Sequence, residues 1–140
     1  MIPTSPPQKN RRGIKPVGKT LEGSPPRLFL DAVERFNGGA FFEAHELWED
    51  LWRASSGFPR DLLQGLVQIS AGFVHAQRGN RKGALSLCAK GLGRLAPYPP
   101  SFWQIDLDTF RREVAQWRET FLLSSGAEES EISFPTILCV

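Results

Sequence analysis

Apolar residues recur every three or four positions along most of this chain, which is the spacing of one face of an α-helix. The first such run starts at Arg27, and the Asn37-Gly38-Gly39 sequence supplies its stop. Glycine and proline positions divide the remaining pattern into separate segments. The pattern predicts five amphipathic helices, at residues 27–37, 41–54, 60–78, 81–95 and 106–122. Because no useful stretch alternates with period two, we expect no strands and predict an all-α fold, a compact bundle.

The chain divides into a tail, one helical domain and a second tail. A length of 140 residues is typical of a single domain. Residues 1–26 hold six of the 11 prolines and few large apolar side chains, so we predict that they are disordered. Residues 27–123 are expected to form the helical domain. Residues 124–140 are first acidic and then apolar, and the pattern leaves open whether this tail docks.

The net charge of +2 originates in the N-terminal tail. Residues 1–26 carry five basic residues and one acidic residue, whereas the rest of the chain carries 12 basic and 14 acidic residues. A mildly acidic body argues against a surface that follows a nucleic-acid backbone. We therefore expect no strong nucleic-acid partner. The basic tail is expected either to touch nucleic acid or acidic lipid weakly, or to be a solvated extension.

The two cysteines provide no disulfide framework. Cys88 falls among apolar residues of a predicted helix, and Cys139 is next to the last residue. We expect both to be reduced thiols, with Cys88 in the core. The run from Leu62 to Gln77 is the longest without charge, but it is too short and too polar to span a bilayer. With no secretory pattern, these features predict a cytoplasmic protein with no membrane partner.

Residues 41–54 carry the most informative chemistry. On a helix turning about 100° per residue, His45 and Glu49 fall inside the aromatic arc, between Trp52 and Phe42. They are one turn apart and can therefore touch. Desolvating an unpaired charge costs several kcal/mol, so both groups need partners. The sequence thus predicts a buried or half-buried polar site.

The third predicted helix offers partners for this site. Gln68 and His75 are two turns apart along one line, and Gly72 lies between them. A glycine there would let another helix or a ligand approach closely. If the two polar stripes face each other, the side chains of both helices converge beside Trp52.

Three interpretations of these residues remain open. In the first, the polar groups form a structural hydrogen-bond network that fixes the register of the helices. In the second, they line a pocket for a small polar ligand or for hydrolysis-like acid–base chemistry, in which Glu49 acts as general base and His45 and His75 bind or transfer protons. The residues expected to contact the ligand in that pocket are Trp52, Arg53 and Gln68.

The third interpretation is a site for a divalent metal ion. His45 and Glu49 at i and i+4 can reach one ion, and His75 from the facing helix would complete three ligands. A zincin-type protease is excluded, because position 49 is Glu where the HExxH motif requires a second His.

A non-enzymatic role is the main alternative to a pocket. In this reading the aromatic helix faces, including Trp103 and Trp117, form a homodimer or partner surface. His45 and Glu49 would then only set the register of the helices. The sequence does not decide whether the protein is an enzyme.

Three segments resemble a known family, in this order along the chain: FNGGAFFEAHELWEDLWR, LLQGLVQISAGFVHAQRGNRKGAL and the leucine-rich stretch that ends in GRLAPYPP. They are similar to domain of unknown function 309, a group of small helical proteins from prokaryotes and the plastid lineage. The likeness covers residues 28–115. It implies a compact all-α fold and a motif centred on His45 and Glu49, and it implies no activity. The matching positions are Phe42, Glu43, Ala44, His45, Glu46, Glu49, Trp52, Arg53, Gly65, Gln68, His75, Arg78, Gly79 and Asn80.

Overall fold

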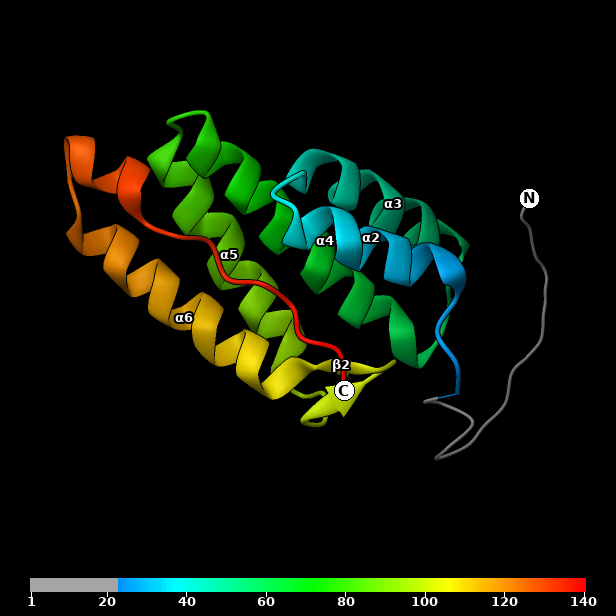
Figure 1. Ribbon diagram of the computed structural model, residues 1–140. Coiled ribbons are helices and arrows are strands. Elements are labelled where there is room, and N and C mark those ends of the chain that lie inside the picture. Colours follow the sequence, from blue (N-terminus) through cyan, green and yellow to red (C-terminus); the bar gives the residue numbers. More distant parts are fainter. Residues whose placement is uncertain (1–22) are drawn as a thin grey trace.

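The computed structural model describes residues 23–140, so most of the tail predicted to be disordered lies outside the described residues. Within them the chain is an all-α bundle, which confirms the predicted fold class (Figure 1). A short 3₁₀ helix, η1 (Gly126–Glu131), follows the last α-helix. The α-helices are α2 (Arg27–Asn37), α3 (Phe41–Ala54), α4 (Phe58–Gln77), α5 (Arg81–Leu95) and α6 (Leu107–Leu123).

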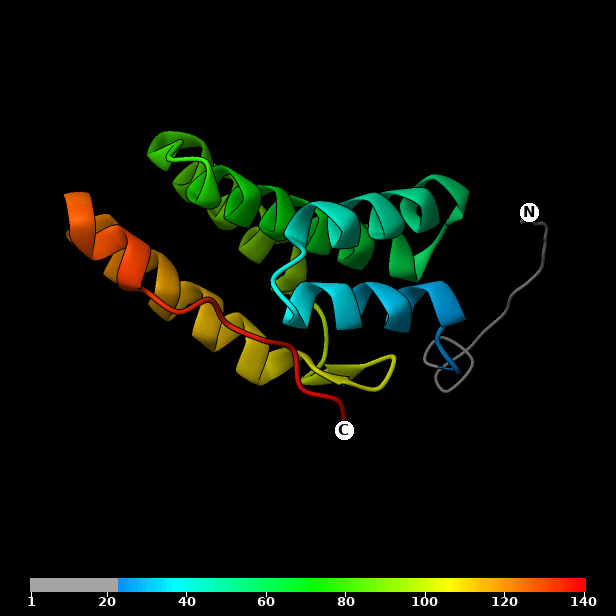
Figure 2. The ribbon, with the colours of Figure 1, turned by 45° about the horizontal axis from the view of Figure 1, so that its top comes forward.

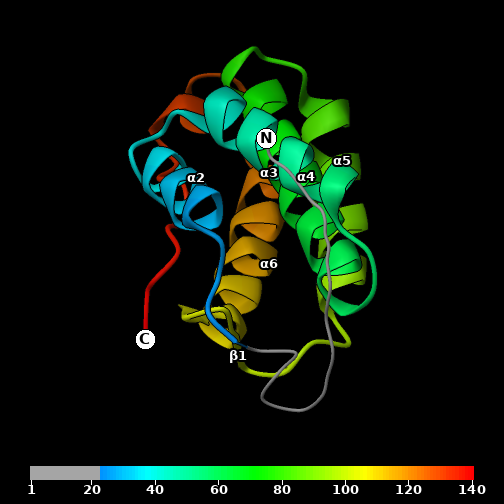
Figure 3. The same ribbon diagram turned by 90° about the vertical axis from the view of Figure 1, so that its right-hand side faces the viewer.

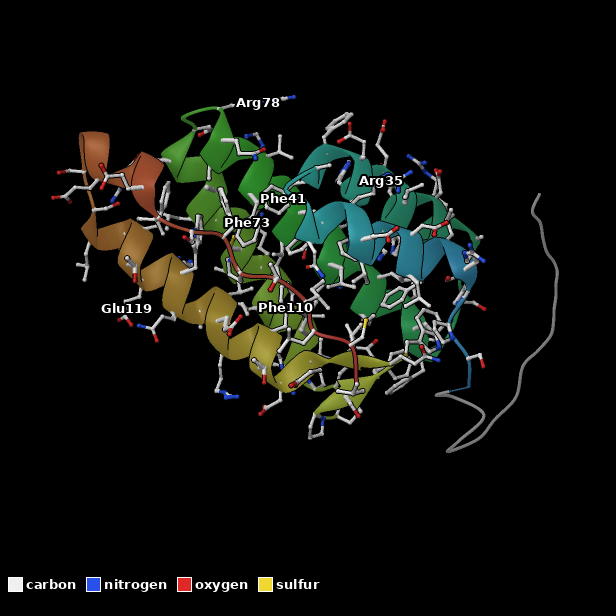
Figure 4. All side chains as sticks on the ribbon, viewed as in Figure 1. Arg35, Phe41, Phe73, Arg78, Phe110 and Glu119 are labelled. Carbon is white, nitrogen blue, oxygen red and sulfur yellow. The ribbon has the colours of Figure 1, made fainter. Side chains whose placement is uncertain are left out.

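The helices form two layers with aromatic rings between them. Figure 2 shows α3 and α4 above α2 and α6, and Figure 3 shows the same arrangement from the side, with α5 beyond α4. Phe36 of α2 lies at the centre, with its ring centroid 4.9 Å from that of Phe41, 5.7 Å from Phe73 and 5.6 Å from Phe110. Figure 4 shows these last three side chains inside the bundle. One aromatic cluster therefore joins α2, α3, α4 and α6.

Helix α4 begins at Phe58, two residues before the predicted start. Pro59 does not prevent this, because residues in the first turn of a helix need no N–H partner within it. The hydroxyl of Tyr98 accepts a hydrogen bond from the Leu62 N–H at 2.9 Å and donates one to the Phe58 carbonyl. A side chain from beyond α5 thus fixes the first turn of α4.

Helices α4 and α5 pack closely because glycines face each other. A Cβ at Gly91 would lie 2.7 Å from the Gly65 carbonyl oxygen and 2.6 Å from Ile69 Cγ1. A Cβ at Gly72 would lie 2.9 Å from the Cys88 sulfur. Gly72 therefore makes room for α5, and not for a ligand between the polar residues of α4.

A two-residue hairpin interrupts the helical pattern. Strands β1 (Ser101–Phe102) and β2 (Ile105–Asp106) pair in antiparallel fashion, so the expectation of no strands is wrong here. The hairpin turn places Trp103 and Gln104 at positive φ angles of 50° and 68°. Turns of this kind need positive φ at both central residues and usually contain Asn or Gly. The sequence carries neither at these positions, and the Trp103 ring packs 5.0 Å from Phe29.

The end of the chain packs on the helices. We call residues 132–140 the C-terminal strap; in Figure 1 it runs in front of α5, beside α6, to β2. Phe134 lies against Phe41 and Phe73 with centroid distances of 4.9 and 5.0 Å, and Ile137 is buried. Cys139 pairs with Ile105 of β2. The question that the sequence pattern left open is thus answered, because this tail completes the core.

None of the helices in residues 23–140 combines the length and the apolar character needed to cross a lipid bilayer.

Candidate functional site

The candidate site lies where α3 packs against α4. The two helices are antiparallel, with Phe41 against Phe73 at one end and Trp52 against Arg60 at the other. In this register Gln68 falls at the level of His45, about one helical turn from the level of Glu49 and about two turns from that of Trp52. All four polar or amphipathic side chains are half-buried. We call His45, Glu49, Trp52 and Gln68 the α3–α4 seam.

His45 and Glu49 form a pair at the edge of the bundle. Nε2 of His45 lies 4.0 Å from Oε1 of Glu49, and the two side chains are 23% and 31% exposed. The imidazole ring stacks on Phe42 with a centroid distance of 5.8 Å, and Phe42 itself is 45% exposed. The pair is therefore covered on one side and open to solvent on the other.

Glu49 also has a cationic neighbour on its own helix. Nη2 of Arg53 lies 3.5 Å from Oε2 of Glu49, and Nη1 of the same guanidinium lies 3.4 Å from Asp50. Pairs that are this exposed are worth at most about 1 kcal/mol each. Arg53 balances the charge of Glu49 but contributes little to stability.

Three seam side chains hold buried polar atoms for which the described residues provide no hydrogen-bond partner. They are Nδ1 of His45, Nε1 of Trp52 and Oε1 of Gln68. Almost all buried polar atoms in folded proteins have a partner, so such a group calls for an explanation. The only others found in the described residues are the indole nitrogens of Trp48 and Trp117.

Arg60 contacts the seam, although the sequence analysis did not predict it as a site residue. Its guanidinium lies 4.2 Å from the centre of the Trp52 ring, and its Nη1 donates to the carbonyls of Trp52 and Ser55 at 2.8 and 3.0 Å. Arg60 therefore provides hydrogen-bond donors for carbonyl groups at the end of α3, and its guanidinium also covers the indole of Trp52. A basic residue in the first turn after a short interhelical loop is the signal that would have indicated it.

His75 is engaged elsewhere. Its Nδ1 accepts a hydrogen bond from Nδ2 of Asn80 at 3.0 Å, and Oδ1 of Asn80 accepts from the Gly83 N–H as the cap of α5. Across residues 23–140 no three His, Cys, Asp or Glu side chains are grouped so that they could hold a metal ion. The predicted three-ligand site of His45, Glu49 and His75 is therefore not formed.

The two tryptophans proposed for a partner surface lie inward. Trp117 is only 4% exposed, and its ring stacks on Phe121 at 4.7 Å. Trp103 is half-buried between Phe29 and Phe102. The interpretation of Trp117 as part of an exposed surface is wrong, because the C-terminal strap and α4 cover it.

Two cavities lie away from the seam. One, of about 480 Å³, lies between Arg112 and Gln116 of α6 and Ser133 of the strap. The other, of about 230 Å³, lies beside Phe58 and Tyr98. Neither is lined by a seam residue.

Comparison with known proteins gives one family. Residues 29–87 match the model described as Domain of unknown function (DUF309), which confirms the resemblance stated above. The matched residues include the whole α3–α4 seam. No curated protein matches the chain.

Proposed function

We propose that this protein, whose residues 29–87 belong to the DUF309 family, binds a small polar ligand at the α3–α4 seam. The observation that carries the proposal is that three buried polar atoms at the seam, on His45, Trp52 and Gln68, have no hydrogen-bond partner among residues 23–140. Leaving such an atom unpaired costs about 1–3 kcal/mol. A molecule that supplies the missing partners removes this cost, which favours its binding.

The unpaired atoms define the chemistry of the ligand. Nε1 of Trp52 can only donate a hydrogen bond, Oε1 of Gln68 can only accept one, and Nδ1 of His45 can do either. The ligand therefore carries both an acceptor and a donor, as a carboxamide or a peptide group does. His45 and Trp52 are seven residues apart, which is about 10 Å along a helix. A ligand that reaches both is about as long as an extended tripeptide.

Binding requires side chains at the rim to move, because the unpaired atoms are covered. Arg53 is 62% exposed, so it can swing away with little loss of packing. The Arg60 guanidinium covers the Trp52 ring from the other end of the seam. We propose that these two cations form the rim through which the ligand reaches the seam.

A second candidate function is acid–base chemistry at the same seam, and the His45–Glu49 pair favours it. With 4.0 Å between Nε2 and Oε1, a small rotation gives a hydrogen bond that relays a proton between the two groups. Glu49 would then act as general base toward a ligand bound beside Trp52. His75 has no part in this mechanism, because Asn80 holds its Nδ1.

The test removes the unpaired atoms by substitution with apolar side chains. Trp52→Phe and Gln68→Leu each remove one unpaired atom. Gln68→Leu keeps the size of the side chain, so we expect this variant to melt at or above the wild-type temperature. The probes are acetamide and triglycine amide, titrated into ¹⁵N-labelled protein. We expect wild-type protein to show shifts of the Trp52 indole and Gln68 side-chain signals, and both variants to lose at least tenfold in affinity.

Matched substitutions outside the seam serve as controls. Trp103→Phe and Gln116→Leu make the same chemical changes at positions away from the seam, and should leave the titration unchanged. Glu49→Gln separates the two candidate functions, because it abolishes a base and only weakens a binding site. If Glu49→Gln and Gln68→Leu both lower the melting temperature strongly and no probe shifts any signal, the seam is a structural network and the proposal is wrong.

A further inference from the structure

The C-terminal strap contacts the helices in the way that a bound peptide contacts its receptor. It contains no helical residue, and two side chains three residues apart, Phe134 and Ile137, pack among residues of the core. The Phe134 ring contacts Phe41, Phe73 and Trp117, which come from three different helices. Phe134 and Ile137 thus attach the strap to the groove formed by the helices.

Backbone hydrogen bonds add a second layer of recognition. The Asp106 N–H donates to the Leu138 carbonyl at 2.8 Å, and the Val140 N–H donates to the Gln104 carbonyl at 2.9 Å. Asn37 of α2 binds both backbone groups of Ile137. Addition of an extended segment to the edge of a sheet is a recurrent mode of peptide recognition.

The connection between α6 and the strap carries an unusual surface. Leu122 and Leu123, the last two residues of α6, are 49% and 80% exposed. They are two of the six large apolar side chains exposed in the described residues. Beyond them lies η1, and Arg81 of α5 contacts both the Leu122 carbonyl and the Glu129 carboxylate. Adjacent leucines left in water at a connection call for a covering surface.

We propose that two copies of this chain form a dimer by exchanging their C-terminal straps. In this dimer each strap occupies the groove of the other copy and makes every contact seen in the single chain. Exchange of an identical segment costs little in contacts, since only the connection changes. Leu122 and Leu123 of the two copies, which lie where the chains cross, then cover each other.

The pairing of Ile105 with Cys139 allows a test of whether the strap next to Ile105 comes from the same chain or from the other copy. The hydrogen bonds at Gln104 and Asp106 flank this pair, so it is a non-hydrogen-bonded antiparallel pair. The Cα atoms of such pairs are about 4.5 Å apart, within the range that a disulfide spans. A disulfide formed by Ile105→Cys with Cys139 therefore joins the strap to the groove that it occupies.

The experiment uses the full chain with Ile105→Cys, as an equal mixture of ¹⁴N- and ¹⁵N-labelled protein that is refolded together and oxidised. We expect a covalent dimer on a non-reducing denaturing gel, with mixed-isotope peptides across the disulfide between positions 105 and 139. A disulfide formed only within single chains would overturn the proposal. Ile105→Cys combined with Cys139→Ser controls for other crosslinks and should give no such dimer.

A second measurement does not depend on the buried position 105. Sedimentation equilibrium of the unmodified chain should give about twice the monomer mass of 15.6 kDa. Leu122→Asp with Leu123→Asp should weaken the dimer at least tenfold, because it places four carboxylates where the chains cross. Ala89→Asp with Ala115→Asp adds the same charge at exposed helical positions and should leave the dimer intact. A monomer at all concentrations, or equal effects of the two double variants, would contradict exchange.

Discussion

The side chain of Asn37 binds the backbone of Ile137 through two hydrogen bonds. Its Nδ2 donates to the Ile137 carbonyl at 2.8 Å, and its Oδ1 accepts from the Ile137 N–H at 2.7 Å. An amide side chain thus takes the place of a neighbouring strand and holds a segment 100 residues away. In the sequence this residue indicated only the end of a helix.

Removal of this amide should loosen the strap. We expect Asn37→Ala to lower the free energy of unfolding by about 1–2 kcal/mol, since two partly buried hydrogen bonds are lost. Asn37→Asp keeps the acceptor for the Ile137 N–H and should fall between wild type and Asn37→Ala. Urea denaturation followed by tryptophan fluorescence measures both. If the free energy of unfolding of Asn37→Ala lies within about 0.5 kcal/mol of the wild-type value, which is less than one hydrogen bond typically contributes, this contact does not hold the strap.

Two glycines of α5 should respond to alanine in opposite directions. A Cβ added at Gly91 would lie 2.7 Å from the Gly65 carbonyl oxygen of α4, which is closer than real Cβ atoms come. Gly91→Ala must therefore push the two helices apart. We expect a loss of about 1–3 kcal/mol. Gly93 lies on the exposed side of the same helix, and no atom of the described residues lies within 4 Å of a Cβ added there, its own helix's backbone and chain neighbours aside. Gly93→Ala should therefore stabilise the protein by up to about 1 kcal/mol through helix propensity.

Thermal melts of the two variants, recorded side by side, test this contrast within one helix. The same chemical change is made two residues apart, so differences in helix propensity cancel. If both variants shift the melting temperature in the same direction, the close contact between α4 and α5 does not limit stability.

The two thiols should differ strongly in reactivity. Burial raises the pKa of the Cys88 thiol to about 12, although the nearby Arg118 guanidinium lowers it somewhat. Cys139 is exposed. At pH 8 we expect Ellman's reagent to modify one thiol per native chain within minutes and two per chain in denaturant. Rapid modification of both thiols in native protein would contradict the buried position of Cys88.

The same pKa shift predicts a loss of stability in alkali. The folded-state pKa of Cys88 lies above its ordinary value of 9.0, so its contribution is fully present below pH 9. This contribution should disappear as the pH rises from about 9 towards about 12, because ionisation of the thiol favours the unfolded chain. Cys88→Ala removes the ionisable group, so its stability relative to wild type should improve over that interval.

Much of the fold follows from local signals in the sequence. Helical periodicity predicted all five α-helices of residues 23–140, and Asn80 accepts from the Gly83 N–H as the predicted N-cap of α5. The hairpin at Ser101–Asp106 has no such signal, because packing of Trp103 on Phe29 replaces the usual turn residues. Docking of the strap depends on partners far away in the chain, which no local pattern specifies.

The candidate site was predictable on one helix and not on the other. The spacing of His45 and Glu49 predicted their contact, because it depends only on helix geometry. The positions of Gln68 and His75 depend on which sector of α4 faces α3. Apolar residues cover most of the circumference of α4, which packs on both α3 and α5, so projection alone could not assign that sector.

The strap has a consequence for folding kinetics. Contacts between successive helices close short loops, whereas the contact between Asn37 and Ile137 closes one of 100 residues. Segments joined by such distant contacts order late on the route to the native state. We therefore expect the helices to assemble first, and Phe134 and Ile137 to pack onto them in the last step.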